Sequence, residues 1–365
     1  MKKILSTLLL ISLIASLISC GNKAKYPPIE STEEESRIVA TMQIEDKKYD
    51  IKYELYRALF ISYADMYDGG DASFWKSDEA SDAKLEINER ILSYAADIYS
   101  VLHLADKLGL DPYSKEKDNL IDKHITAGVE GSDEDAIDGF GGDYEAYLEW
   151  LSSLGLNYSA HVLILRYAIA YDDIVTYYSG TVDSENPTVN MQNGALQYTE
   201  NDVLDFYNSD ECVRVSVIEL NSAYVSRSVA EERRDKIASF AATEDALNYA
   251  VSLTSGVASD IIDGVVIGSM SLDSAFYGGV TEAAFGLEIN ETSEVIDVFT
   301  DLTEEYWILY RQEKSAEFYE SYKYDIENVY KAQKINEILF SVKDTLLKSI
   351  ENIDVTAAVD LSGIK

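Results

Sequence analysis

Few residues of this chain combine the types and spacing that metal binding or nucleophilic catalysis requires. The histidines His103, His124 and His161 fall in separate helical segments and lack the H-x-x-x-H spacing of a zinc site. Cys212 stands beside an apolar strand with no evident base, which is the setting of a core thiol. The sequence has neither the G-x-S-x-G turn of hydrolases nor a G-x-x-x-x-G-K-S/T phosphate loop. We therefore expect all four of these residues to be structural.

An acidic, glycine-rich segment, residues 131–143, is the other candidate for binding chemistry. Its stretch 133–139 (DEDAIDG) resembles a calcium loop only superficially, because Ile137 occupies the fifth position, where that motif needs an oxygen ligand. A solvated acidic loop is the simpler interpretation, and whether the segment binds cations stays open. We predict neither a metal site nor a cofactor.

The overall charge excludes some partners. The chain has 66 acidic and 30 basic residues, a formal net charge of −36, so we expect it to repel nucleic acid and anionic lipid headgroups. A solubilising surface explains this charge, and a preference for basic binding partners is the alternative. The chain also contains 27 tyrosines, which suit core packing and equally suit a surface that grips varied polypeptides.

The first residues predict where the protein resides. A basic start (MKK) precedes an apolar run at residues 4–18, which is shorter than the roughly 20 residues that span a membrane. The run ends in LISC, which resembles a bacterial lipobox with Cys20 as the lipidated residue. We therefore predict a signal peptide (1–19) and an extracytoplasmic protein anchored to the cell membrane by lipid; ordinary secretion with Cys20 incidental is the alternative. Cys212 would then have no disulfide partner in the chain.

The periodicity of apolar residues predicts a helical region followed by a small α+β region. After a flexible tether (20–37), a short hairpin leads into helices that include an apolar stripe from Ile91 to Leu108. Ser114 can cap one of these helices, and Thr199 to Asp202 (TEND) fits a capping box at the start of a later one. From residue 208 the pattern changes to alternating strands, the first at 213–220, and short helices. Residues 313–350 return to a helical stripe too apolar to face water, so we expect them to pack back on the first region.

The α+β region resembles a parvulin-type peptidyl-prolyl isomerase domain. The matching segments, with the family pattern after each, are RVSVIEL at 214–220 (K-A-S-H-I-L-V), GVVIG at 264–268 (G-G-D-L-G), AAFGL at 283–287 (A-A-F-x-L), NETS at 290–293 (G-E-x-S) and YWIL at 306–309 (Y-H-I-I). The order of the segments along the chain, more than any one of them, carries the resemblance.

The departures from the family pattern bear on activity. Val217 and Trp307 stand where the family has its two signature histidines, while Phe276 and Val280 occupy positions of the proline pocket. An isomerase must lower a rotation barrier of about 18–20 kcal/mol, and neither Val217 nor Trp307 can hydrogen-bond as an imidazole does. The resemblance thus implies a parvulin-like scaffold with impaired catalysis and no catalytic residue at these positions; Phe276 and Val280 become tentative peptide-binding residues.

The layout of the whole chain resembles the PrsA type of foldase lipoproteins, whose helical part is similar to SurA-like chaperones. This resemblance implies a multidomain protein: a helical chaperone domain (38–207), an inserted parvulin-like domain (208–312) and a C-terminal helix (313–365) packing on the first domain. The implied function is a chaperone that holds unfolded secreted polypeptides between its domains. An active isomerase and a non-catalytic surface lipoprotein, for adhesion or solute capture, are the alternatives.

Overall fold

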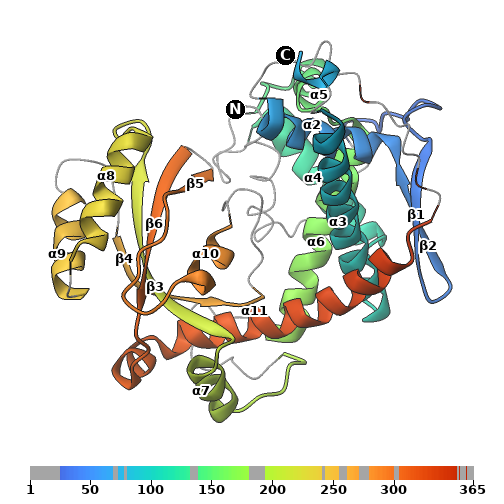
Figure 1. Ribbon diagram of the computed structural model, residues 1–365. Helices are drawn as coiled ribbons and strands as arrows, with labels where there is room; N and C mark the ends of the chain where they lie inside the picture. Colours follow the sequence, from blue (N-terminus) through green and yellow to red (C-terminus); the bar gives the residue numbers. More distant parts are fainter. Residues whose placement is uncertain are drawn as a thin grey trace. The chain divides into compact units, whose positions relative to one another are not determined.

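The chain divides into two compact units. A computed structural model describes residues 25–68, 73–77, 80–131, 139–180, 194–240, 243–254, 261–270, 279–299, 304–351, 353 and 359 (Figure 1). The helical unit comprises residues 1–174 and 339–365, and the sheet unit comprises residues 175–338. Cys20, Phe276 and residues 132–138 of the acidic loop lie outside the described residues.

The helical unit begins with an antiparallel hairpin and continues as helices. Its elements are β1 (Ile38–Ile44), β2 (Lys47–Lys52), α2 (Tyr53–Asp68), η3 (Phe74–Lys76), α3 (Ala80–Lys107), α4 (Lys115–Glu130), α5 (Tyr144–Ser153) and α6 (Tyr158–Ser179), whose last residues pass into the sheet unit. The apolar stripe of α3 is fully buried at Ile91, Ile98 and Leu102. The predicted cap of α4 is confirmed, because the Ser114 side chain accepts from the Lys117 N–H.

The turn between α5 and α6 fixes the start of α6. Gly155 has a φ of 79°, and a Cβ there would lie 2.6 Å from the Ile61 side chain, so only glycine fits without rearrangement. Two residues later, Asn157 caps α6 by accepting from the Ala160 N–H at 2.9 Å. The chain direction after Gly155 thereby places the first turn of α6 beside α2 and the N-terminal segment.

The N-terminal segment packs on the helical unit earlier than the sequence predicts. The expected flexible tether ran to residue 37, but the Tyr26 ring lies 5.0 Å from the Tyr144 ring, and Tyr144 donates to the Pro27 carbonyl at 2.8 Å. Farther along, Ser31 Oγ is 2.9 Å from Ser159 Oγ. The polar composition of this segment suggested a tether because its partners, on α5 and α6, are more than 100 residues away in sequence.

The sheet unit contains a four-stranded antiparallel sheet with strand order β4-β3-β6-β5. Its elements are α7 (Glu200–Asn208), β3 (Cys212–Asn221), α8 (Arg227–Ala238), α9 (Thr243–Thr254), β4 (Ile261–Gly268), α10 (Val280–Gly286), β5 (Ile296–Phe299) and β6 (Glu304–Gln312). Helices α8 and α9 cover one face of the sheet and α10 covers the other (Figure 1). The capping box predicted at the start of α7 is confirmed between Thr199 and Asp202.

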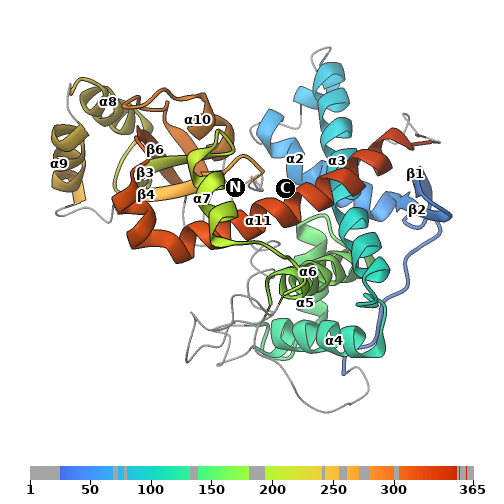
Figure 2. The ribbon, with the colours of Figure 1, turned by 90° about the horizontal axis from the view of Figure 1, so that it is seen from below.

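The last helix, α11 (Ala316–Lys348), is shared by both units. Its first part packs Phe318, Ile326 and Tyr330 against α7 in the sheet unit (Figure 2). In the helical unit, Lys343 Nζ binds Asp97 of α3 at 2.8 Å, and Glu351 exchanges two backbone hydrogen bonds with β1.

The unit boundaries therefore differ from the expected domain limits. Residues 175–207 and 313–338 belong with the sheet, where the sequence placed them with the helical domain or its returning helix. The apolar stripe at 313–350 predicts one packing partner for the whole helix. In the structure α11 is kinked at Tyr322, which is 43% exposed, and the stripe residues on α11 pack in both units. Apolar periodicity specifies which face of a helix is buried and does not specify its neighbour.

Candidate functional site

The face of the sheet beneath α10 is apolar at the positions that the parvulin resemblance marks as catalytic. Successive strand residues point to opposite faces, so Val213, Val215 and Val217 of β3 all face α10. They form one cluster with Val280 and Ala284 of α10. The exposed fraction of Val217 is 4%, which leaves this side chain almost no contact with solvent.

Three of the predicted site residues meet in this cluster. In the strand register, Val217 lies opposite Leu309, and Trp307 lies opposite Glu219, so Val217 and Trp307 are diagonal neighbours on one face. Trp307 is half-buried, and its indole Nε1 donates to Glu305 at 2.8 Å. Val280 is buried in the same cluster, whereas Phe276 lies outside the described residues. Among the described residues, the cluster supplies apolar contacts, and its one polar side-chain group, the indole N–H of Trp307, already donates to Glu305.

The opposite face of the sheet buries a polar pair that the sequence did not single out. Gln312 Nε2 donates to Ser216 Oγ, and the exposed fractions of these residues are 5% and 0%. Ser216 matches the serine of the family strand pattern K-A-S-H, which is the one signal that could have drawn attention to it. The pair lies on the face covered by α8 and α9, so it satisfies buried polar groups and does not face the α10 cluster.

Cys212 has the environment of a core thiol. It is buried, and its Sγ lies 3.4 Å and 3.3 Å from the carbonyl oxygens of Phe206 and Tyr207. Burial raises the pKa of the Cys212 thiol to about 11, so the nucleophilic thiolate is scarce at neutral pH. The expectation of a structural cysteine is confirmed.

The three histidines are buried in the helical unit, and His124 lies near His161. His161 lies 2.9 Å from the Tyr147 hydroxyl through Nε2, and His103 lies 3.0 Å from the Tyr49 hydroxyl through Nδ1. Burial lowers the pKa of both imidazoles. Within the described ranges, no three histidine, cysteine or carboxylate side chains come together as metal ligands would. No described helix is long and apolar enough to cross a bilayer.

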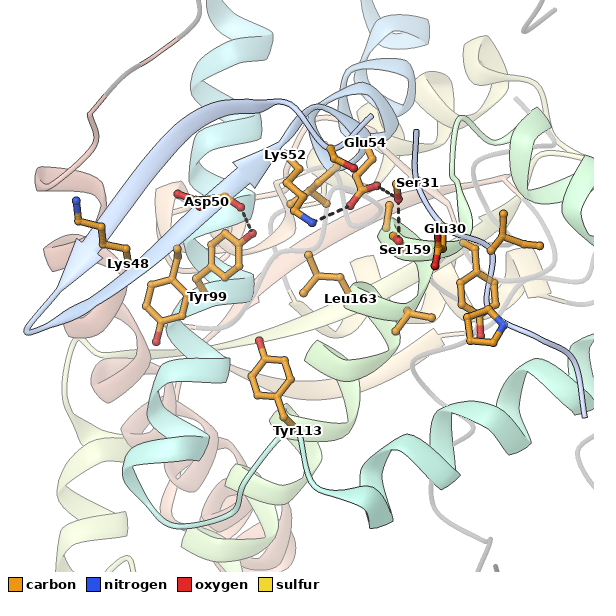
Figure 3. A pocket seen from close by; sticks show the side chains of 18 residues that line it. Glu30, Ser31, Lys48, Asp50, Lys52, Glu54, Tyr99, Tyr113, Ser159 and Leu163 are labelled. Atoms are coloured by element: carbon orange, nitrogen blue, oxygen red, sulfur yellow. Dashed lines mark hydrogen bonds and ion pairs between the residues drawn. The ribbon is translucent and has the colours of Figure 1, made fainter. Parts of the chain in front are cut away.

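A pocket of about 670 Å³ in the helical unit has no counterpart in the sequence analysis (Figure 3). Its walls come from residues 28–36 of the N-terminal segment, β2 with the first residues of α2, α3, the α3–α4 connection and the first turns of α6. The volume is in the range of sites that bind small molecules or a few amino-acid residues. Segments so distant in sequence share no local pattern, and for that reason sequence reasoning missed the site.

Aromatic rings dominate one end of the pocket. Tyr49 of β2 stacks on Tyr99 of α3 at 5.1 Å between ring centroids, and Tyr99 donates to the Asp50 carbonyl at 2.8 Å. Tyr113 has an exposed fraction of 58% at the mouth, and the Arg166 guanidinium lies 4.8 Å from its ring centroid. The Tyr113 ring is thus held in place while one face stays accessible.

The other end of the pocket is closed by a polar network around Glu54. This carboxylate is 7% exposed and accepts from Ser31 Oγ and, at 3.0 Å, from Asn157 Nδ2. Lys52 Nζ lies 3.9 Å from its other oxygen. Because the buried carboxylate has hydrogen bonds and a nearby cation, it fastens the N-terminal segment as a wall of the pocket.

Comparison with known proteins gives similarity at the level of solved structures. No family model and no curated protein matches the chain. The chain is similar to crystal structures of PrsA foldase proteins from Streptococcus pneumoniae (16% identity, 71% of this chain and 86% of that chain, TM-score 0.30) and Lactococcus lactis (15%, 88% and 96%, TM-score 0.24). A third, from Bacillus subtilis, is 17% identical over 69% of this chain and 82% of its own, with a TM-score of 0.23. The structural neighbours are thus of the type that the sequence motifs indicate.

Proposed function

We propose that this protein is a foldase or chaperone, anchored by lipid at the extracytoplasmic face of the membrane, that binds unfolded secreted polypeptides. The observation that carries the proposal is the tyrosine-lined pocket of the helical unit. Tyr49, Tyr99 and Tyr113 offer large, rigid contact surfaces with polar tips, which suit side chains of varied sequence. The name foldase, which the similar structures carry, agrees with this function.

Client binding is tested by suppression of aggregation. Reduced lysozyme and reduced α-lactalbumin are clients of similar size and opposite charge, so the pair separates binding from charge preference. We expect the protein to suppress aggregation of both at near-stoichiometric ratio, and of the basic client at lower concentration because of the net charge of −36. Unchanged aggregation of both clients would overturn the proposal and favour a surface lipoprotein that serves adhesion or solute capture.

The proposal includes an impaired parvulin-like domain. Val217 is buried against Leu309 and α10, and Trp307 directs its indole N–H to Glu305. Stabilising a twisted imide requires hydrogen-bonding groups within reach of the substrate, and these two side chains supply none. We expect no more than a few per cent of an ordinary parvulin's turnover in a proline-peptide assay; full turnover would make the protein an active isomerase instead.

The lipid anchor belongs to the same proposal and has its own test. The LISC motif ending at Cys20 and the short apolar run before it support lipidation. In a bacterial host, Cys20→Ser should release the protein from the membrane fraction or leave it as an uncleaved precursor. A variant that stays processed and membrane-bound like the wild type would contradict lipidation at Cys20.

A further inference from the structure

We propose that β2 binds one extended segment of a client polypeptide as an added antiparallel strand along its outer edge, with alternate side chains of that segment entering the pocket. The inference rests on the proposed function and specifies how the pocket of the helical unit recognises its clients. The occupant is a five-residue stretch that alternates charged and apolar residues. Four observations of this unit lead to it.

The first observation is the direction of the β2 backbone groups. The N–H and the C=O of Thr41 in β1 both form hydrogen bonds with the backbone of Glu351, so these two groups point away from β2. Its partner across the hairpin, Asp50, therefore belongs to a non-hydrogen-bonded pair and points its own N–H and C=O outward. Backbone groups alternate in direction along a strand, so the N–H and C=O of Lys48 and Lys52 also point outward. All three residues line the pocket.

The second observation is that the hairpin already accepts an added segment on its other edge. Residues 349–351 lie along β1, where Glu351 forms an antiparallel bridge with Thr41 at 2.9 Å for both hydrogen bonds. Ser349 Oγ also accepts from the Gln43 N–H at 2.7 Å. The edge of β1 is thereby covered by the chain itself, and the edge of β2 is the one that faces the pocket.

The third observation is the alternation of side chains along β2. Tyr49 and Ile51 face inward, and Ile51 is fully buried, whereas Lys48, Asp50 and Lys52 are exposed on the other face. Side chains of an added strand that lie opposite Tyr49 and Ile51 would share their face and meet Leu163 and Tyr113 across the pocket (Figure 3). Apolar side chains are therefore favoured at these two positions.

The fourth observation is the charge order of the exposed face, which reads basic, acidic, basic at Lys48, Asp50 and Lys52. Directly opposite residues of an antiparallel pair interact through their side chains, so the complementary segment reads acidic, basic, acidic. Five residues in extended conformation span about 14 Å between the first and last Cα at about 3.4 Å per residue. Together these conditions give the core sequence Glu-Leu-Lys-Phe-Glu.

The Tyr99 hydroxyl is compatible with this pairing. It donates to the Asp50 carbonyl, whose oxygen has a second lone pair for the N–H of an added strand. The Asp50 N–H donates in turn to the carbonyl of the same added residue.

The probe for the test is the capped peptide acetyl-Thr-Glu-Leu-Lys-Phe-Glu-Thr-amide with a dye on an added terminal linker, and binding is followed by fluorescence anisotropy. Asp50→Pro removes the outward N–H of β2 but no backbone hydrogen bond to β1, since that N–H does not point to β1. Asp50→Ala is the matched control, because it loses the same carboxylate, with the hydrogen bond that the carboxylate accepts from Thr41 Oγ1, and keeps the N–H. We expect binding about five- to tenfold weaker in Asp50→Pro than in Asp50→Ala.

Modified peptides test the pairing on wild-type protein and so do not depend on how a variant folds. Methylation of the backbone nitrogen of the central lysine removes the N–H that would bind the Asp50 carbonyl, and binding should weaken about tenfold. Methylation of the phenylalanine nitrogen, which would point away from β2, is the control and should weaken binding less than threefold. A peptide with the charges reversed to Lys-Leu-Glu-Phe-Lys should bind roughly fivefold more weakly.

The outcomes separate this inference from the proposed function. Equal binding of the two methylated peptides, or no binding of the parent peptide to the wild type, overturns strand addition at β2. If aggregation of reduced lysozyme and α-lactalbumin is nevertheless suppressed, clients bind by another route and the chaperone function stands. If peptide binding shows the expected ranking and aggregation is unaffected, strand addition stands and the chaperone function fails.

Discussion

The buried imidazole of His161 should make the helical unit sensitive to mild acid. Its exposed fraction is 1%, its Nε2 lies 2.9 Å from the Tyr147 hydroxyl, and its Nδ1 has no hydrogen-bond partner among the described residues. Burial, and then the nearby His124, lower the pKa of His161 from 6.5 to about 3. The folded state therefore holds a neutral ring at pH values where the unfolded chain binds a proton.

The pKa of His161 in the unfolded chain, 6.5, and in the folded state, about 3, gives the sign and size of the change in stability with pH. Because the folded pKa is depressed, the unfolded state binds more protons as the pH falls below about 6.5, and stability is lost progressively down to about pH 3. One pKa unit corresponds to about 1.4 kcal/mol. Between pH 7 and pH 5, His161 alone should lower the free energy of unfolding by roughly 2 kcal/mol.

The assay is urea unfolding at pH 7 and pH 5, followed by tryptophan fluorescence in a Trp307→Phe background. The chain has three tryptophans, and the other two, Trp75 and Trp150, lie in the helical unit, so the signal reports that unit alone. His161→Gln keeps a polar side chain near the Tyr147 hydroxyl and does not titrate. We expect its loss of stability at pH 5 to be smaller than that of the parent by roughly 2 kcal/mol.

A control variant and one contrary outcome test whether His161 is buried as a neutral ring. Tyr147→Phe removes the hydroxyl and no titrating imidazole, so it should lower stability by about 0.5–1.5 kcal/mol at pH 7 and keep a pH dependence like that of the parent. If the parent and His161→Gln lose the same free energy between pH 7 and pH 5, the imidazole is already solvated or protonated in the folded state. The description of His161 as a buried neutral ring would then be wrong.

Three further predictions concern packing and reactivity. Leu346→Ala at a fully buried position of α11 should cost the helical unit about 2–5 kcal/mol in the same urea assay, and an unchanged midpoint would contradict its packing there. Cys212 should react with a thiol reagent at the rate of global unfolding, since burial raises its pKa to about 11; rapid labelling of the native protein would show an accessible thiolate. Val217→His should not restore proline turnover and should cost roughly 1–3 kcal/mol, because the ring enters an apolar cluster without a partner; turnover near that of an ordinary parvulin would refute the impairment argument.

The sequence alone determined the local structure closely. The stripe that begins at Ile91 predicted α3, the alternation at 213–220 predicted β3 at Cys212–Asn221, and the caps at Ser114 and Thr199 form as expected. These features depend on residues a few positions apart, so periodicity and side-chain chemistry are sufficient to place them. The apolar identity of Val217 and Trp307 could also be read directly, once the parvulin motifs gave the register.

Only the tertiary structure decided what these elements pack against. The pocket combines residues near positions 30, 50, 99, 113 and 160, and no local pattern relates segments so far apart in sequence. The N-terminal segment reads as a tether until its partners on α5 and α6 are known. The apolar stripe of α11 serves both units, because burial determines which face of a helix is apolar and does not determine which element packs on that face.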